Sequence, residues 1–94
     1  MGDLSMRRVL ADAITRYGEG HQMVVAMEEL AELVQAICKH LRGEPDNIPE
    51  EIADVRIVLA QLEMMLECTE EVQDWMERKV DRLERRIKGG EDER

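Results

Sequence analysis

Two pairs of acidic residues, Glu29 with Glu32 and Glu51 with Asp54, are each three positions apart within an apolar helical pattern. Residues at this spacing lie on one face of an α-helix, so each pair can point its carboxylate oxygens at a common point. Oxygen ligands of this kind favour a hard divalent ion such as Mg²⁺, with Mn²⁺ as a substitute. The competing interpretation is that these acids are solvated helix positions in a chain with 22 Asp and Glu residues.

Both pairs belong to helices predicted over about residues 21–42 and 49–68, which the turn-forming segment 43–47 joins. Asn47 has the position of an N-cap for the second of these helices. Helices joined by so short a loop run antiparallel, which allows the two acidic pairs to face each other. Four carboxylates at one place repel one another strongly unless a cation neutralises them. The pattern therefore predicts a metal site between these helices.

Two more helices are predicted, one over about residues 4–17 and one that begins at Thr69 and ends at Gly89-Gly90. The expected architecture is all-α, with a single four-helix domain over residues 1–90 and a charged tail at 91–94. Because the chain has no Phe, one Trp and one Tyr, its core must consist of Leu, Ile, Val, Met and Ala. A small domain with this palette buries little surface, which predicts self-association.

An apolar seam in steps of three and four residues runs along each of the last three predicted helices and is expected to face the core. Its residues are Met23, Met27, Leu30, Val34, Ile37 and Leu41, then Ile52, Val55, Leu59, Leu62 and Leu66, then Val72, Met76, Val80, Leu83 and Ile87. One position before each seam lies a polar stripe, which in the last helix contains Lys79, Arg82 and Arg86. These cations are expected to approach the acids across one cleft, as binding of a polyphosphate or nucleotide requires. The alternative is a solvated face that pairs with neighbours such as Glu71 and Asp81.

The net charge of −9 argues against binding of a nucleic-acid polymer, which requires a basic surface. No apolar run approaches the roughly 18 residues that cross a membrane, and the first residues lack the apolar segment of a signal peptide. Cys38 and Cys68 lie within apolar helical patterns, which predicts buried thiols in a reducing cytoplasm. Trp75 is interpreted as a core or dimer-interface residue, with stacking on a base as the alternative.

The segment E-E-L-A-E at 28–32, followed by E-E-I-A-D at 50–54, resembles the EExxE…ExxD signature of the MazG-like, all-α nucleoside triphosphate pyrophosphohydrolases. The flanking segments are similar to those of the small single-domain branch of that family: Y-G-E-G-H-Q at 17–22, K-H-L-R-G at 39–43 and A-D-V-R-I-V-L-A-Q-L at 53–62. The resemblance covers about residues 15–90. It implies a four-helix bundle whose core is completed by oligomerisation, as a homodimer or homotetramer.

The resemblance also implies roles for individual residues. The expected Mg²⁺ ligands are Glu29, Glu32, Glu51 and Asp54. The expected catalytic acids, which would orient a water, are Glu28 and Glu50. Substrate contacts are expected from Gln22, Lys39, Lys79, Arg82, and Arg85 or Arg86, although several relatives have an Asn where this chain has Arg82.

The implied reaction is hydrolysis of a nucleoside triphosphate between its α and β phosphates, giving the monophosphate and pyrophosphate, in a role such as cleansing of the nucleotide pool. One alternative with the same fold is phosphoribosyl-ATP pyrophosphatase. Another is a non-catalytic helical oligomer that keeps the acids only as metal or nucleotide ligands. A di-iron carboxylate centre does not fit, because that class uses Glu-x-x-His pairs and no Glu precedes either His at that spacing.

Overall fold

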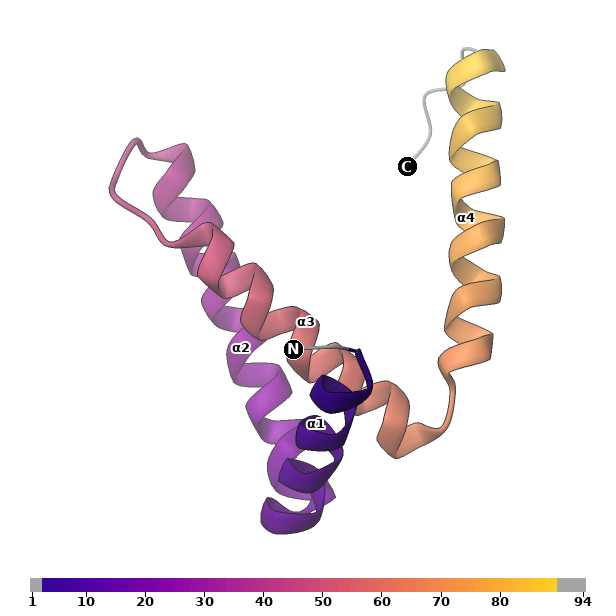
Figure 1. Ribbon diagram of the computed structural model, residues 1–94. Helices are drawn as coiled ribbons and strands as arrows, with labels where there is room; N and C mark the ends of the chain where they lie inside the picture. Colours follow the sequence, from indigo (N-terminus) through magenta and orange to yellow (C-terminus); the bar gives the residue numbers. More distant parts are fainter. Residues whose placement is uncertain (1–2, 90–94) are drawn as a thin grey trace.

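A computed structural model describes residues 3–89 of the chain, and Figure 1 shows that these residues are helical almost throughout. The helices are α1 (Asp3–Tyr17), α2 (Glu19–Leu41), α3 (Ile48–Leu66) and α4 (Thr69–Gly89), and the described residues contain no strand. The predicted all-α class and the four predicted helices are thereby confirmed. The predicted charged tail at 91–94 and its preceding Gly90 lie outside the described residues.

The joints between the helices depend on residues with a positive φ. Gly18, at +93°, is the only residue between α1 and α2, and Gly43, at +76°, lies just after the end of α2. Glu67, at +51°, ends α3 in the left-handed conformation. Glycine adopts such angles without a steric penalty, which explains why α1 and α2 can be joined by one residue. The short joints then dictate which helices can pack together.

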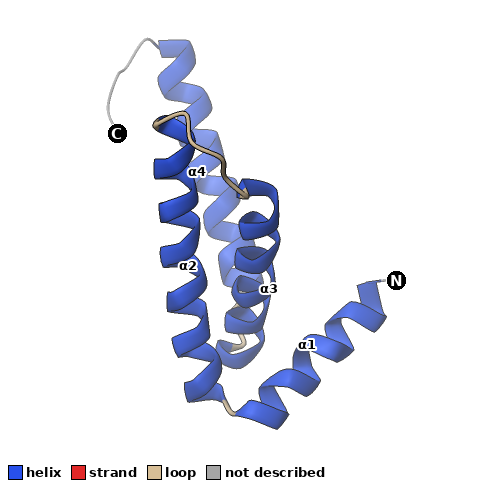
Figure 2. Cartoon of the chain, turned by 90° about the vertical axis from the view of Figure 1, so that its left-hand side faces the viewer, coloured by secondary structure: helices blue, strands red, loops and turns tan. Residues whose placement is uncertain are grey.

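Helices α2 and α3 form an antiparallel hairpin, as the sequence predicts, and Figure 2 shows them side by side. The buried apolar residues of the described chain are all in this pair, namely Ala26 and Ala36 of α2 and Val55 and Val58 of α3. The two alanines let the helix backbones approach closely, since the distance between packed helices depends on side-chain size at the contact. This hairpin is the part of the fold that positions the acidic residues.

Most of the predicted core seam does not face the neighbouring helix, and for these residues the sequence prediction is wrong in a single chain; Val55 of α3 is the seam residue that is buried. On α2 the seam residue Val34 is 59% exposed, while Ala36 and Ala26, from the adjacent stripe, are 2% exposed. On α3 the seam residue Leu59 is 42% exposed, while Val58, one position before it, is 3% exposed. The contact between α2 and α3 therefore uses mainly the stripe one position before the seam, together with the seam residue Val55. The apolar seam itself lies largely on the outside of the hairpin.

A buried amide relay ties α1 to the hairpin. Gln61 Nε2 donates to the Leu10 carbonyl at 3.1 Å, and Gln22 Nε2 donates to Gln61 Oε1 at 3.1 Å. The side chains of Gln22 and Gln61 are 7% and 2% exposed, so these bonds are made away from water. Buried amides must be paired to avoid a desolvation penalty. The relay therefore specifies how α1, α2 and α3 meet.

Helix α4 stands apart from the other three helices (Figure 1). Among the described residues, α4 contacts only α3, which it follows after the turn at Glu67 and Cys68. The predicted four-helix bundle is consequently not closed within one chain. Cys38 is exposed and Cys68 is half-buried, and both thiols are free, so the predicted burial of Cys38 is not observed. None of the helices within residues 3–89 combines the length and apolarity needed to cross a membrane.

Candidate metal centre

The acidic site lies between the middle of α2 and the first turns of α3. Glu29 of α2 and Glu51 and Asp54 of α3 each offer one carboxylate oxygen, and these three oxygens lie within 4.8 Å of one another. The antiparallel hairpin brings the residues together because the first turns of α3 lie opposite the middle of α2. Three of the four sequence-predicted metal ligands therefore converge.

Glu51 is the most deeply placed of the three, with 8% of its surface exposed. Its Oε2 accepts a hydrogen bond of 2.8 Å from Asn47 Nδ2, whereas its Oε1 is buried without a hydrogen-bond partner. Glu29 Oε1 is also buried without a partner among the described residues. A buried carboxylate oxygen without a partner is costly, and an ion is one of the few things that can satisfy it.

The pKa of Glu29 is raised by its surroundings in the cluster. Partial burial raises this pKa above its ordinary value of 4.5, and the negative charges of Asp54, Glu32, Glu51 and Glu28 raise it further. Both effects oppose ionisation, because the carboxylate loses water and gains like-charged neighbours. The site is therefore one where a positive ion would be stabilised.

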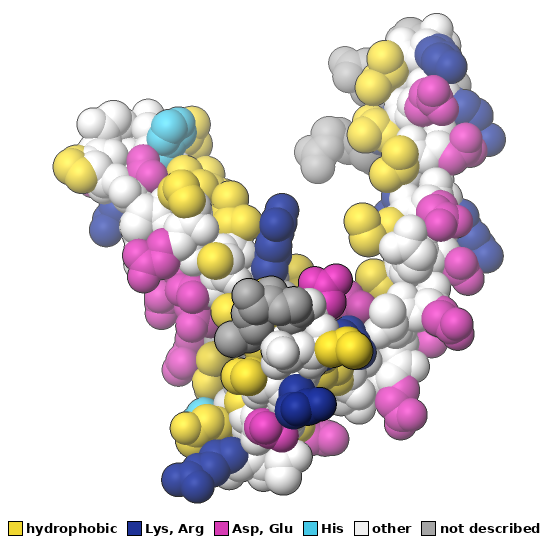
Figure 3. Space-filling view, in the orientation of Figure 1, with side chains coloured by type: hydrophobic (Ala, Val, Ile, Leu, Met, Phe, Trp, Pro, Cys, Tyr) yellow, Lys and Arg dark blue, Asp and Glu magenta, His cyan; other side chains and the backbone are white. Residues whose placement is uncertain are grey.

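Glu32, the fourth predicted ligand, is exposed and is not part of the group of three converging oxygens. It is nevertheless near enough to raise the pKa of Glu29. Glu28 and Glu50, the predicted catalytic acids, are exposed, each one position before a residue of the cluster. Figure 3 shows acidic side chains gathered along the edge of the α2–α3 hairpin that faces away from α4.

The chemistry of the donors fits Mg²⁺. All three are carboxylate oxygens, two of them with a buried oxygen atom that makes no hydrogen bond, and no His or Cys belongs to the group. Zinc sites in proteins draw mainly on His and Cys, whereas Mg²⁺ is bound by one or two carboxylates together with water and substrate phosphates. Glu29, Glu51 and Asp54 are thus the residues that could hold such an ion.

The structure does not bring the predicted substrate contacts to this site. Gln22 is buried in the amide relay, and Lys39 is exposed near the end of α2. Lys79 and Arg82 lie on α4, which makes no contact with α2 among the described residues, and Arg86 is half-buried farther along α4. The expected meeting of these cations with the acids is therefore absent within one chain, because α4 leaves the hairpin at the end of α3.

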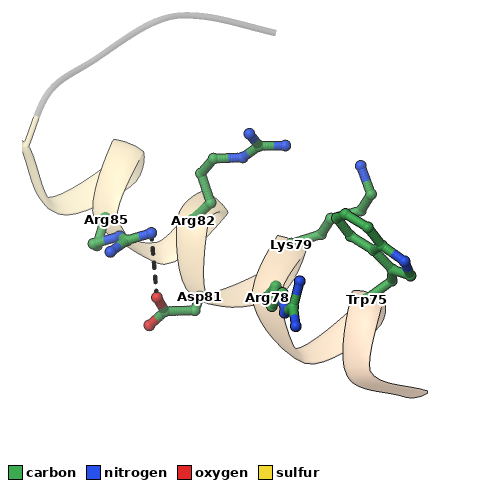
Figure 4. A pocket seen from close by; sticks show the side chains of 6 residues that line it. All are labelled: Trp75, Arg78, Lys79, Asp81, Arg82 and Arg85. Carbon is green, nitrogen blue, oxygen red and sulfur yellow. Dashed lines mark ion pairs between the residues drawn. The ribbon is translucent and has the colours of Figure 1, made fainter. Parts of the chain in front are cut away.

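Two cations of α4, Arg78 and Lys79, lie beside Trp75, and Figure 4 shows Arg82 and Arg85 farther along the helix. Trp75 is 54% exposed, so it is not a core residue of the single chain. The Arg78 guanidinium lies 5.1 Å and the Lys79 ammonium 5.8 Å from the centre of its ring, distances at which cation–π attraction operates. Arg85 is paired with Asp81 at 3.3 Å, one turn earlier on the same helix. These cations form a row on the surface of α4, which makes no contact with α2 among the described residues.

Sequence reasoning missed two residues that shape the site. Asn47 is interpreted from the sequence only as a cap, and it does occupy the N-cap position, but its side chain makes no capping bond and donates to Glu51 instead. The backbone N–H of Ile48, at the start of α3, instead donates to Asp46 Oδ1 at 3.2 Å. Gln61 has no predicted role and proves to be the centre of the amide relay. The spacing of Asn47 and Glu51, four residues apart, is the signal that could have revealed the first contact.

No protein-family model matches this sequence, and comparisons with curated proteins and with solved structures found no match. The resemblance to MazG-like pyrophosphohydrolases therefore rests on the two acidic motifs and their flanking segments.

Proposed function

We propose that this protein is a Mg²⁺-dependent nucleoside triphosphate pyrophosphohydrolase of the MazG-like type, which converts a (d)NTP and water to the (d)NMP and pyrophosphate in the cytoplasm. One observation carries the proposal. Glu29, Glu51 and Asp54, which belong to the two resembling motifs, converge with two buried carboxylate oxygens that have no partner. Buried polar atoms normally have a hydrogen-bond partner, so two unpaired carboxylate oxygens at one place favour a bound cation.

In this proposal each acid has a distinct task. Glu29, Glu51 and Asp54 hold the ion, and Asn47 fixes the orientation of Glu51 through its hydrogen bond. Mg²⁺, when bound, neutralises phosphate charge and lowers the pKa of a water. Glu28 and Glu50 are the exposed acids beside the cluster that would orient the attacking water and take up its proton. No side-chain nucleophile is required for in-line attack by water on a phosphoryl group.

Lys39 remains the proposed phosphate contact on α2, since it is exposed on the helix that carries Glu29. Lys79, Arg82 and Arg86 are proposed as phosphate contacts that reach the site from another chain, because their own α4 makes no contact with α2. Gln22 is the weakest of the proposed substrate contacts, since its amide nitrogen is already bonded to Gln61.

The proposal is tested by measuring pyrophosphate release from a panel of ribo- and deoxyribonucleoside triphosphates in Mg²⁺ and in EDTA. Asp54→Asn should lower the rate by about 100-fold or more, because it removes a proposed metal ligand. Loss of a residue that only orients a ligand typically costs about 10- to 100-fold. Its melting temperature in EDTA should stay the same or rise, since one repelling charge is removed. Asp74→Asn, an exposed change on α4, is the matched control and should leave the rate unchanged.

Release that persists in EDTA would contradict the proposed metal role. Absence of release from every nucleotide, in wild-type protein that is stabilised by Mg²⁺, would contradict the proposed reaction. Turnover of phosphoribosyl-ATP, or nucleotide-dependent stabilisation without turnover, would then identify the alternative function.

A further inference from the structure

The amide relay that ties α1 to the hairpin continues to the surface of the protein at His21. Gln22 Oε1, at the end of the relay that does not bond Gln61, lies 2.9 Å from His21 Nδ1. His21 is exposed in the first turn of α2, whereas Gln22 is 7% exposed. The relay thus joins four groups in a row, from a surface imidazole to a backbone carbonyl of α1. The proposed reaction makes no use of His21.

The direction of each hydrogen bond in this row is fixed by its inner end. The Leu10 carbonyl can only accept, so Gln61 must turn its Nε2 toward Leu10 and its Oε1 toward Gln22. Gln22 must then present its own Nε2 to Gln61, which leaves Gln22 Oε1 for His21. An amide turned the other way would place two acceptors or two donors against each other. The row therefore runs in one direction, and its outer end requires a donor.

This requirement determines which nitrogen of the imidazole carries a hydrogen. An acceptor oxygen at 2.9 Å needs a hydrogen on His21 Nδ1, which only the Nδ1–H tautomer and the doubly protonated ring possess. The Nε2–H tautomer would direct a nitrogen lone pair at Gln22 Oε1 and leave that oxygen without its partner. In proteins, the hydrogen bond made by one ring nitrogen sets the tautomer of a histidine. The neutral His21 ring is therefore expected to carry its hydrogen on Nδ1.

Helix α1 depends on such directed contacts, because it has little apolar packing. None of its described residues is buried. Among the described residues, the bond from Gln61 to the Leu10 carbonyl is the only one that a side chain of the hairpin makes to α1. The Tyr17 ring, at the end of α1, has its centre 5.6 Å from that of the His21 ring. His21 therefore meets α1 twice, directly at Tyr17 and through the relay at Leu10.

We propose that His21 is a positioning residue for α1. Its Nδ1–H completes the row of hydrogen bonds that ends at the Leu10 carbonyl, and the row in turn holds the neutral ring in the Nδ1–H tautomer. Without this donor the oxygen of a largely buried amide loses its partner, which weakens the relay and the attachment of α1.

The first test reads the tautomer of His21 from the nitrogen chemical shifts of its ring in the wild-type protein. The spectra are recorded at about pH 8.5, where an imidazole is ordinarily neutral. The signals are assigned by their absence from His21→Asn. The Nδ1–H tautomer should be the dominant form. A mixture of tautomers, or a dominant Nε2–H form, would overturn the proposal.

The second test removes the amide that gives the row its direction. Gln61→Met keeps an unbranched side chain of similar length and has no hydrogen-bonding group that could orient Gln22. Gln22 can then turn its amide round, so the Nε2–H tautomer of His21 should appear. The matched control is Gln35→Met, at an exposed position of α2, which should leave the tautomer unchanged. An unchanged tautomer in folded Gln61→Met would show that the relay does not set it.

The third test separates the donor of His21 from its ring, and it decides the matter if Gln61→Met does not fold. His21→Asn retains an N–H donor near the position of Nδ1 and loses the ring, whereas His21→Phe retains a ring against Tyr17 and loses the donor. Hydrogen exchange of the α1 amides, relative to those of α3, should stay near the wild-type rate in His21→Asn. In His21→Phe it should be about fivefold or more faster. Equal exchange rates in the two variants would overturn the proposed role of the donor.

Discussion

Glu51 is oriented by a side chain that does not itself belong to the cluster of acids. Asn47 Nδ2 donates to Glu51 Oε2 at 2.8 Å, whereas the buried Oε1 has no hydrogen-bond partner and is the oxygen that the proposed cation would bind. Residues that hold a metal ligand in place commonly contribute a factor of about 10–100 to metal affinity. Asn47 is therefore part of the candidate site, because its hydrogen bond fixes the orientation of Glu51.

Replacing Asn47 by Ala should weaken Mg²⁺ binding by about 10- to 100-fold. The free energy of unfolding in EDTA should also fall, by about 1–3 kcal/mol, because Glu51 Oε2 loses its hydrogen-bond partner. Mg²⁺ affinity is measured by calorimetric titration, and stability by urea unfolding. Asp46→Ala is the control, since it removes the bond to the Ile48 amide and should lower stability with little effect on Mg²⁺ affinity. The reverse pattern would contradict this assignment.

If Mg²⁺ binds as proposed, the raised pKa of Glu29 should make its effect on stability depend on pH. In the metal-free protein the stabilising contribution of this group is fully present below its ordinary pKa of 4.5 and is lost as pH rises through the raised pKa. Mg²⁺ requires the ionised carboxylate, so the Mg²⁺-induced rise in melting temperature should be full at neutral pH and should shrink as pH falls through the raised pKa. Melting curves in Mg²⁺ and in EDTA across this range measure the effect. An undiminished Mg²⁺ effect at pH 4.5 would show that Glu29 does not bind the ion.

At the scale of the elements, the single-residue joint between α1 and α2 decides where α1 can pack. Gly18 has φ +93°, and Gly20, two residues later, has a helical conformation in the first turn of α2. A Cβ added at either position would meet no atom within 4 Å. The two glycines therefore differ in backbone conformation and not in steric surroundings, which makes them a matched pair.

Gly18→Ala should lower the free energy of unfolding by about 1–3 kcal/mol, because an alanine at this positive φ is strained. Gly20→Ala should raise it by up to about 1 kcal/mol, because alanine is the better helix former. Urea unfolding of the two variants beside the wild-type protein measures both changes. Equal effects of the same sign would contradict the described conformation of the joint.

At the scale of the whole molecule, the buried apolar residues within residues 3–89 all lie in the hairpin of α2 and α3, and α4 extends from it with exposed apolar residues such as Met76 and Val80. A net charge of −9 opposes close approach of two copies, since like charges repel. The exposed apolar residues of α4, namely Met76, Val80, Leu83 and Ile87, lie apart from the acids of the hairpin, which gather on its edge that faces away from α4 (Figure 3).

The helices, their order and the convergence of the acids could be predicted from the sequence, because each depends on local spacing. The steps of three and four residues place Glu51 and Asp54 on one helix face, and the short segment after Gly43 makes the two central helices antiparallel. The side of each helix that is buried could not be predicted in the same way. Adjacent residues such as Val34 and Leu33, or Leu59 and Val58, are all apolar, so periodicity alone does not choose between two stripes.

The sequence by itself thus determined an all-helical chain with an acidic centre between α2 and α3, since local propensity and spacing suffice for both. Only the tertiary structure decided that Glu32 remains outside the three converging oxygens, that Asn47 bonds Glu51 and that Gln61 joins three helices. It also decided that α4 leaves its own hairpin. These features depend on packing distances and backbone angles between residues far apart in sequence, such as Gln61 and Leu10, which periodicity does not encode.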